Sequence, residues 1–230
     1  LQPPSPDLRF GTDQLGQDVF ARTVYGARVS LIVGFSVATI SILVGLTIGL
    51  FAGYYRRFDA IVMRLMDGLM AIPAILLAIA MVSLNQGSIG IVIAAISIPE
   101  LPRVVRLVRS IVLSVKELPF VEAARACGAR TPRLLFWHIM PSTIAPLIVQ
   151  ATYICASAIL VEASLSFLGA GVPPEVPSWG NMIASSRLYL ARAPWTIFCP
   201  AIALALVVLA VNLLGDGLRD RLDPRLSRRL

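Results

Sequence analysis

The sequence has few of the side chains from which catalytic and metal sites are built. It contains one histidine, His138, and three cysteines, Cys127, Cys155 and Cys199, which lie far apart without a C-x-x-C spacing. This pattern indicates neither a disulfide framework nor a zinc site. No Ser/His/Asp or Cys/His combination is available for nucleophilic catalysis, so we expect a chain that is not an enzyme and has no catalytic or metal-binding residues.

Lysine is nearly absent as well, which bears on nucleotide binding. The only lysine, Lys116, is not preceded by a Gly-x-x-x-x-Gly-Lys sequence, so the chain has no P-loop for ATP. The net charge of +7 comes from basic residues that flank apolar stretches. These residues lack the interleaved aromatics of a nucleic-acid surface. We therefore expect no cofactor in this chain and no nucleic-acid partner.

Charged residues make up only 14% of the chain, whereas 57% of the residues are hydrophobic. Four stretches carry no charged side chain: 29–55, 68–99, 142–161 and 193–215. Each approaches or exceeds the roughly 20 apolar residues that cross a hydrocarbon core. Buried helices of soluble proteins are usually shorter and have a polar face, and a signal-peptide core is shorter than the first stretch. The sequence thus predicts an all-α polytopic membrane protein.

Five transmembrane helices are expected from these stretches. The first, fourth and fifth are predicted at about 29–55, 143–168 and 195–214. A turn at 85–88 divides the uncharged stretch 68–99 into the second and third helices. The third is expected to leave the membrane as one long helix that carries Arg103, Arg106 and Arg109 into solvent or headgroups. Pro200 is expected to kink the fifth helix.

The first predicted span has one flank of small residues. Its glycines are Gly34, Gly45, Gly49 and Gly53. Small residues let helix backbones approach closely in lipid. We therefore expect another helix to pack tightly along this flank.

Lysine and arginine are unevenly divided between the two sides. Segments 56–67, 100–133 and 216–230 hold three, seven and five of them, and the opposite side holds five. By the positive-inside rule the first group of segments faces the cytoplasm. The chain is then one transmembrane domain, 1–230, with four extramembrane parts. These are an external or interfacial segment at 1–28, a cytoplasmic loop at 100–141, an external loop at 169–194 and a cytoplasmic tail at 216–230.

Two short helices are predicted within the cytoplasmic loop. Pro119 suits the first turn of a helix, and Gly128 can take the left-handed conformation that ends it. Thr131 and Pro132 are expected to start a second helix as its N-cap and first residue, and Pro141 to close it. The first helix presents small residues and one acid. That surface suits a groove on a partner protein, although an amphipathic helix lying on the bilayer fits the spacing too.

The same loop resembles the EAA loop of ABC-importer permeases. The resemblance is carried by Glu122-Ala123-Ala124, by Gly128 and by His138-Ile139-Met140-Pro141. In that family the loop is the coupling helix, which docks on the nucleotide-binding subunit. The resemblance therefore implies ATPase-coupling roles for Glu122, Ala123, Ala124, Gly128, His138 and Pro141. From the residues alone, His138 is better explained as a helix-terminal histidine with a satisfied hydrogen bond.

The resemblance extends along the whole chain to dipeptide and oligopeptide permeases of the DppC/OppC type. The matching segments are 11–19, 25–28, 162–169, 177–180, 212–220 and 223–225. Two departures occur: Pro141-Ser142 replaces the usual Pro-Asn, and Glu100-Leu101-Pro102 replaces the usual aromatics. Members usually have one more helix before Gly11, which gives six spans, and we expect this helix to be missing here.

The resemblance implies a permease subunit that translocates dipeptides or oligopeptides across the inner membrane of a prokaryote by alternating access. Its expected partners are a second homologous permease subunit, two subunits that bind ATP and magnesium, an external substrate-binding protein and the lipid bilayer. Related permeases carry nickel, glutathione-like or murein peptides, so these substrates stay open. A stand-alone secondary transporter or channel is a weaker alternative, because the spans offer few charges or breaks for an ion site.

Glu162 is the one acid within an otherwise apolar span. An ionisable residue inside a membrane segment is a candidate for the translocation path. The alternative is a structural role near the outer surface, where the carboxyl group pairs with a neighbouring helix or holds the following loop. The sequence favours the structural role.

Overall fold

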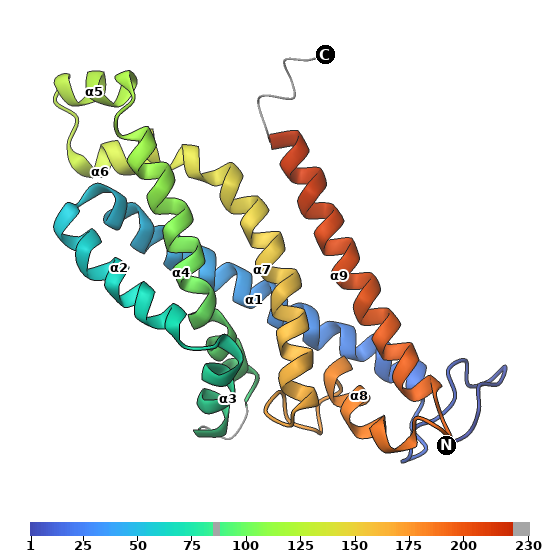
Figure 1. The fold of residues 1–230 in the computed structure, drawn as a ribbon. Helices are drawn as coiled ribbons and strands as arrows, with labels where there is room; N and C mark the ends of the chain where they lie inside the picture. Colours follow the sequence, from blue (N-terminus) through green and yellow to red (C-terminus); the bar gives the residue numbers. More distant parts are fainter. Residues whose placement is uncertain (85–87, 223–230) are drawn as a thin grey trace. The chain divides into compact units, whose positions relative to one another are not determined.

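The computed structural model describes residues 1–84 and 88–222, which are helical apart from loops and one isolated bridge between Thr12 and Asp18 (Figure 1). The α-helices are α1 (Val19–Tyr54), α2 (Arg56–Ala71), α3 (Ala74–Leu84), α4 (Ile89–Val115), α5 (Pro119–Ala126), α6 (Thr131–Arg133), α7 (Pro141–Phe167), α8 (Trp179–Ser186) and α9 (Trp195–Leu222). A π-helix, η1 (Leu134–Ile139), precedes α7, and a 3-10 helix, η2 (Arg187–Tyr189), follows α8. The predicted turn at 85–88 falls on residues 85–87, outside the described residues, and the predicted tail is described only to Leu222.

Three of the described helices, α1, α7 and α9, are long and apolar enough to cross a membrane. A fourth span is counted if α2 and α3 form one broken span. The described chain is therefore an all-helical membrane protein with three to four candidate spans. The remaining predicted span is α4, a single helix of 27 residues that continues through Pro99 and Pro102, as expected. Its charged residues, which include Glu100 and Arg103, keep it below the hydropathy of the other spans.

The predicted second span is wrong in one respect, because it is not one helix. The chain leaves helical geometry at Ile72, whose φ and ψ are −89° and 126°, and α3 begins after Pro73. Proline lacks an N–H group and its ring disfavours helical geometry in the residue before it. The uncharged stretch that begins at Gly68 is thus divided between α2 and α3.

The described chain forms two compact units. The first consists of residues 1–37, 74–96 and 154–213, and the second of residues 38–73, 97–153 and 214–222. In the first unit, a Cβ atom at Gly34 would lie 2.8 Å from Cγ1 of Ile159, so α1 and α7 touch there without room for a side chain. Trp179 at the start of α8 is fully buried in the same unit.

The second unit contains the predicted close packing along the glycine flank. Cβ atoms built at Gly45 and Gly49 would lie 2.6 and 2.7 Å from the Cβ atoms of Val104 and Val108. Gly53 approaches Val112 in the same way. Each of these three glycines therefore faces one valine of α4, and the expectation of a tight helix contact is confirmed.

Candidate functional site

The first short helix of the loop, α5, begins at Pro119 as predicted and leaves most of its surface open. Val121 is buried, whereas Glu122 and Ala123 are exposed. The chain turns at Gly128 with φ of +83°, and nothing lies within 4 Å of a Cβ atom built there. Gly128 is therefore required by its left-handed backbone and not by crowding.

The second part of the loop differs from the prediction. The helix begins at Thr131 with Arg130 as its N-cap, and no side chain caps it. Thr131 is thus not the N-cap, because its hydroxyl does not bond a free N–H of the first turn. The segment then widens into the π-helix η1, in which the N–H of Met140 donates to the carbonyl of Leu135 at 2.8 Å.

The π-helix explains how the loop joins the following span. Leu134, Leu135 and Ile139 are buried, so η1 contributes to the packing at the base of the span. Pro141 is the first residue of α7, so it opens the span, and the helix before it has already ended at Ile139. The prediction that Pro141 closes the second helix is therefore wrong, because Pro141 begins the next one.

His138 has the ordinary environment that the sequence favoured. Its Nδ1 atom lies 3.3 Å from the carbonyl oxygen of Arg133, and the side chain is half-buried. With Nδ1 protonated, the ring donates to that carbonyl within the same helical segment. The segment η1, which carries His138, packs against α5, which carries Glu122.

Glu162 lies at the centre of a polar cluster in the first unit. Its side chain is completely buried. Oε2 accepts a hydrogen bond of 3.1 Å from the Ser30 hydroxyl of α1, and Oε1 accepts one of 2.9 Å from the Ser166 hydroxyl of α7. The hydroxyl of Ser178, the N-cap of α8, bonds the same carboxyl group. One acid thus joins α1, α7 and the start of α8.

The helix α8 within the outer loop was not predicted, although the sequence contained a signal for it. Ser178 accepts a hydrogen bond of 3.2 Å from the N–H of Asn181, as an N-cap residue does. Nε1 of Trp179 donates to the carbonyl of Thr23 at 2.9 Å. Nδ2 of Asn181 donates to the carbonyls of Val172 and Pro173 at 3.0 and 3.1 Å. The outer loop is therefore a folded cap on its unit.

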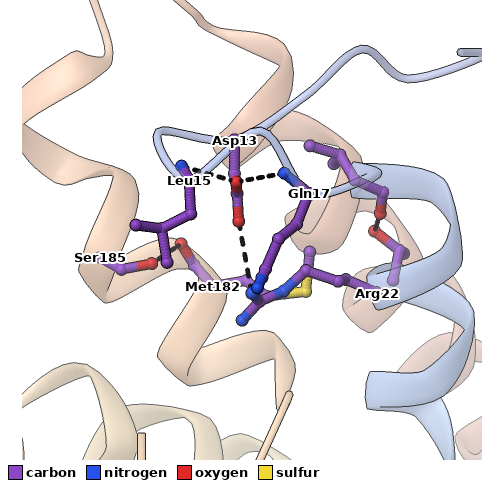
Figure 2. Close-up of polar contacts among 8 residues, drawn as sticks. Asp13, Leu15, Gln17, Arg22, Met182 and Ser185 are labelled. Carbon is purple, nitrogen blue, oxygen red and sulfur yellow. Dashed lines mark hydrogen bonds and ion pairs between the residues drawn. The ribbon is translucent and has the colours of Figure 1, made fainter. Parts of the chain in front are cut away.

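A hollow of about 880 Å³ opens beside this cap. Its polar lining includes Asp13, Arg22, Asn181 and Arg187. Oδ1 of Asp13 accepts hydrogen bonds from the N–H groups of Leu15 and Gln17 at 2.9 and 2.8 Å, and Oδ2 pairs with Nη1 of Arg22 at 3.3 Å (Figure 2). Asp13 therefore folds the N-terminal turn over the wall that α8 forms.

In the described part of the chain, no three or more His, Cys, Asp or Glu residues are grouped as metal ligands would be. Asp13 and Glu162 are instead bonded to an arginine, to hydroxyls or to backbone N–H groups. The site therefore consists of two separate surfaces, each within one unit: the loop around α5 in the second and the folded outer cap in the first.

The chain is similar to known transport proteins over nearly its whole length. The sequence model of a family described as "Binding-protein-dependent transport system inner membrane component" matches residues 45–228. The chain is 65% identical over 229 residues to the "Probable peptide ABC transporter permease protein y4tQ" of Sinorhizobium fredii, with 100% of this chain and 79% of that protein covered.

Two further relatives carry names with different substrates. The chain is 48% identical to the "Dipeptide transport system permease protein DppC" of Alkalihalophilus pseudofirmus, with 99% of this chain and 75% of that protein covered. It is 42% identical to the "Glutathione transport system permease protein GsiD" of Pectobacterium atrosepticum, with 97% and 75% covered.

A solved structure has the same fold. A chain of "Inward facing conformations of the MetNI methionine ABC transporter" is 18% identical, with a TM-score of 0.69. The match covers 92% of this chain and 100% of that chain. At this identity the likeness concerns the arrangement of helices alone.

Proposed function

This chain belongs to the family of binding-protein-dependent transport system inner membrane components, and on that premise we propose that the loop around α5 is where a separate ATPase drives it. The chain is a non-catalytic, multi-pass permease subunit of a bacterial peptide ABC transporter in the inner membrane. The observation that carries the proposal is the open surface of α5. This surface presents Glu122 beside small side chains, while Val121 alone of the helix is buried.

The proposed mechanism is alternating access. Two ATPase subunits, which bind ATP and magnesium, close on each other and push the α5 helices of this chain and of a second homologous permease subunit. The spans then tilt from an inward-open to an outward-open arrangement, so that a peptide delivered outside can pass. Glu122 orients the contact by its charge, and small residues at Ala123 and Ala124 let the partner approach closely.

The base of the loop has the contacts needed to transmit such a push. Nζ of Lys116, just after α4, donates to the carbonyl of Gly53 at 3.1 Å, which ties the loop to the end of α1. Val115 and Val121 are buried on either side of the turn that starts α5. A displacement of α5 therefore moves α4 with it, instead of being lost in a flexible connector.

The proposed topology has five spans, with α4 as the additional one. Segments 56–67, 100–141 and 216–230 then face the cytoplasm, and segments 1–28 and 169–194 face outward. The folded outer cap, fixed by Glu162 and Asn181, offers a rigid surface to an external substrate-binding protein. In this arrangement Glu162 has a structural role and does not line the path.

Dipeptides or oligopeptides are the proposed substrates. This rests on the names of relatives that are 65% and 48% identical to the chain. Glutathione, itself a small peptide, is the second candidate because a relative of that name is 42% identical. Identification of the ligand on the cognate external binding protein distinguishes the two.

The coupling proposal is tested with Glu122→Arg and Gly128→Val in the assembled transporter in proteoliposomes. We expect both variants to insert normally but to lose most peptide uptake and peptide-stimulated ATP hydrolysis. In Glu122→Arg the docking charge is reversed, and in Gly128→Val a β-branched residue is forced into a left-handed conformation. Asp220→Arg, an exposed acid near the end of α9, is the matched control and should keep full activity. Full uptake and stimulated hydrolysis in the α5 variants would contradict the proposal.

A further inference from the structure

The π-helix η1 exposes two large aromatic side chains beside an arginine. Trp137 is 77% exposed and Phe136 is 46% exposed. Together with Pro132 and Arg133 they line a hollow of about 420 Å³. The buried residues of η1, such as Leu134 and Ile139, occupy its other side, so the aromatic pair has no partner within the described chain.

We propose that the slot formed by Pro132, Arg133, Phe136 and Trp137 binds the headgroup of an anionic phospholipid at the membrane surface. The inference goes beyond the coupling proposal and depends only on the chain being an inner-membrane protein. Its occupant is argued below from the position of the slot and from its charge.

The slot lies next to a membrane span. Trp137 precedes Pro141, the first residue of the candidate span α7, by four residues. At the helical rise per residue, four residues extend about 6 Å. The headgroup layer on each side of the hydrocarbon core is roughly 5–8 Å thick. With α7 entering the hydrocarbon core at its first turn, Trp137 falls within that layer, where tryptophan is enriched because its ring is apolar and its N–H is polar.

The charge of this segment selects an anionic partner. Arg130 and Arg133 are exposed, and the sequence contains no Asp or Glu from residue 123 to residue 161. A guanidinium group binds phosphate oxygens through paired N–H donors. The apolar walls of Phe136 and Trp137 suit the glycerol and upper acyl region below a phosphate. A lipid fits this combination of cation and apolar walls.

The surface proposed for the ATPase is a different one. Within the second unit, Figure 1 shows α5 above α6, with the chain running from α6 toward α7. Glu122 and the small residues are on α5, whereas the aromatic slot adjoins the span. The two surfaces can therefore be occupied together.

The test uses the assembled transporter in nanodiscs of phosphatidylcholine with and without phosphatidylglycerol. Native mass spectrometry should show phosphatidylglycerol retained in preference to phosphatidylcholine. Arg133→Ala should lower that retention about fivefold, since one basic residue near an anionic surface contributes on this order. Arg125→Ala, an exposed arginine on α5 outside the slot, is the matched control and should leave retention unchanged.

A second measurement places the lipid at Trp137 without relying on retention. Phosphatidylglycerol with brominated acyl chains should quench a component of tryptophan fluorescence that Trp137→Phe removes. Equal retention of the two lipids in the unsubstituted transporter, or no effect of Arg133→Ala, would overturn the proposal. Quenching at Trp137 that emerges only after the ATPase subunits are stripped away would also overturn it, because it assigns the slot to the ATPase.

Discussion

Arg109 of α4 forms a bidentate ion pair with Asp59 of α2. Its Nη2 donates to Oδ2 of Asp59 at 2.7 Å, and its Nε donates to Oδ1. Both side chains are partly buried. Arg106 pairs with Asp67 farther along the same two helices. A two-pronged pair fixes orientation as well as distance. Since α2 ends at the break before Pro73, these pairs hold a short helix that has no continuous span to anchor it.

Loss of the pair should destabilise the transporter. Arg109→Leu leaves Asp59 partly buried without its cation, and hydrogen bonds to charged groups contribute about 1.5–3 kcal/mol. The melting temperature of the purified complex should fall, and Asp59→Leu combined with Arg109→Leu should recover part of it. Arg64→Ala serves as the control, because Arg64 is an exposed arginine on α2, the helix of Asp59. This variant should have the same melting temperature as the unsubstituted complex. A melting temperature unchanged by Arg109→Leu would refute the role given to the pair.

The glycine flank of α1 predicts a size-dependent effect. Gly49→Val places a side chain where Cβ alone would be 2.7 Å from Val108, so α1 and α4 must separate. We expect a poor yield of folded transporter from Gly49→Val and a partial rescue by Val108→Ala, measured by size-exclusion chromatography in detergent. Gly68→Ala is the control, because a Cβ atom there meets nothing within 4 Å. An equal yield from Gly49→Val and Gly68→Ala would show that the close contact is unimportant.

Substitutions of Glu162 distinguish a structural role of its carboxyl group from a role in the translocation path. Glu162→Gln keeps an oxygen and an amide that can bond the hydroxyls of Ser30 and Ser166, so stability and peptide uptake should stay within about twofold. Glu162→Ala leaves those hydroxyls unpaired beside a cavity and should lower stability by about 2–4 kcal/mol. Thermal unfolding and uptake are measured on the same preparations. A stable Glu162→Gln protein without uptake would place the carboxylate in the path.

Asp13 should control the N-terminal turn through its two backbone acceptor bonds more than through its charge. Asp13→Asn keeps Oδ1 as an acceptor for the N–H groups of Leu15 and Gln17, although it weakens the pair with Arg22. Asp13→Ala removes all three contacts. Hydrogen exchange at the turn should quicken clearly in Asp13→Ala and little in Asp13→Asn, and similar exchange in the two variants would contradict this assignment.

Uncharged stretches and turn residues predicted most of the fold. The lengths of the apolar stretches located α1, α7 and α9, and Pro119 and Gly128 located α5, because each of these signals acts within its own segment. The break at Ile72 was missed although Pro73 was visible, since proline is tolerated inside membrane helices and α4 passes through two of them.

The polar cluster around Glu162 could not be predicted from the sequence. Ser30, Ser166 and Ser178 come from three separate segments, and only the folded unit brings them to one carboxyl group. The sequence favours a structural role for Glu162, but no local pattern identifies the partners of its carboxyl group. The helix α8 was missed for a different reason, because its eight residues contain no long apolar stretch. The N-cap residue Ser178 is the one local signal for it.

The bond from Met140 to the carbonyl of Leu135 reaches back five residues, one more than the bonds of an α-helix. Deleting one residue there would restore ordinary helical bonding and rotate everything before it by about 100° relative to α7. Leu134 and Leu135 would turn away from the interior, and Phe136 and Trp137 would turn toward it. The rotational phase between the loop and the span is thus encoded by a single inserted residue, which makes the length of this segment more constrained than its composition.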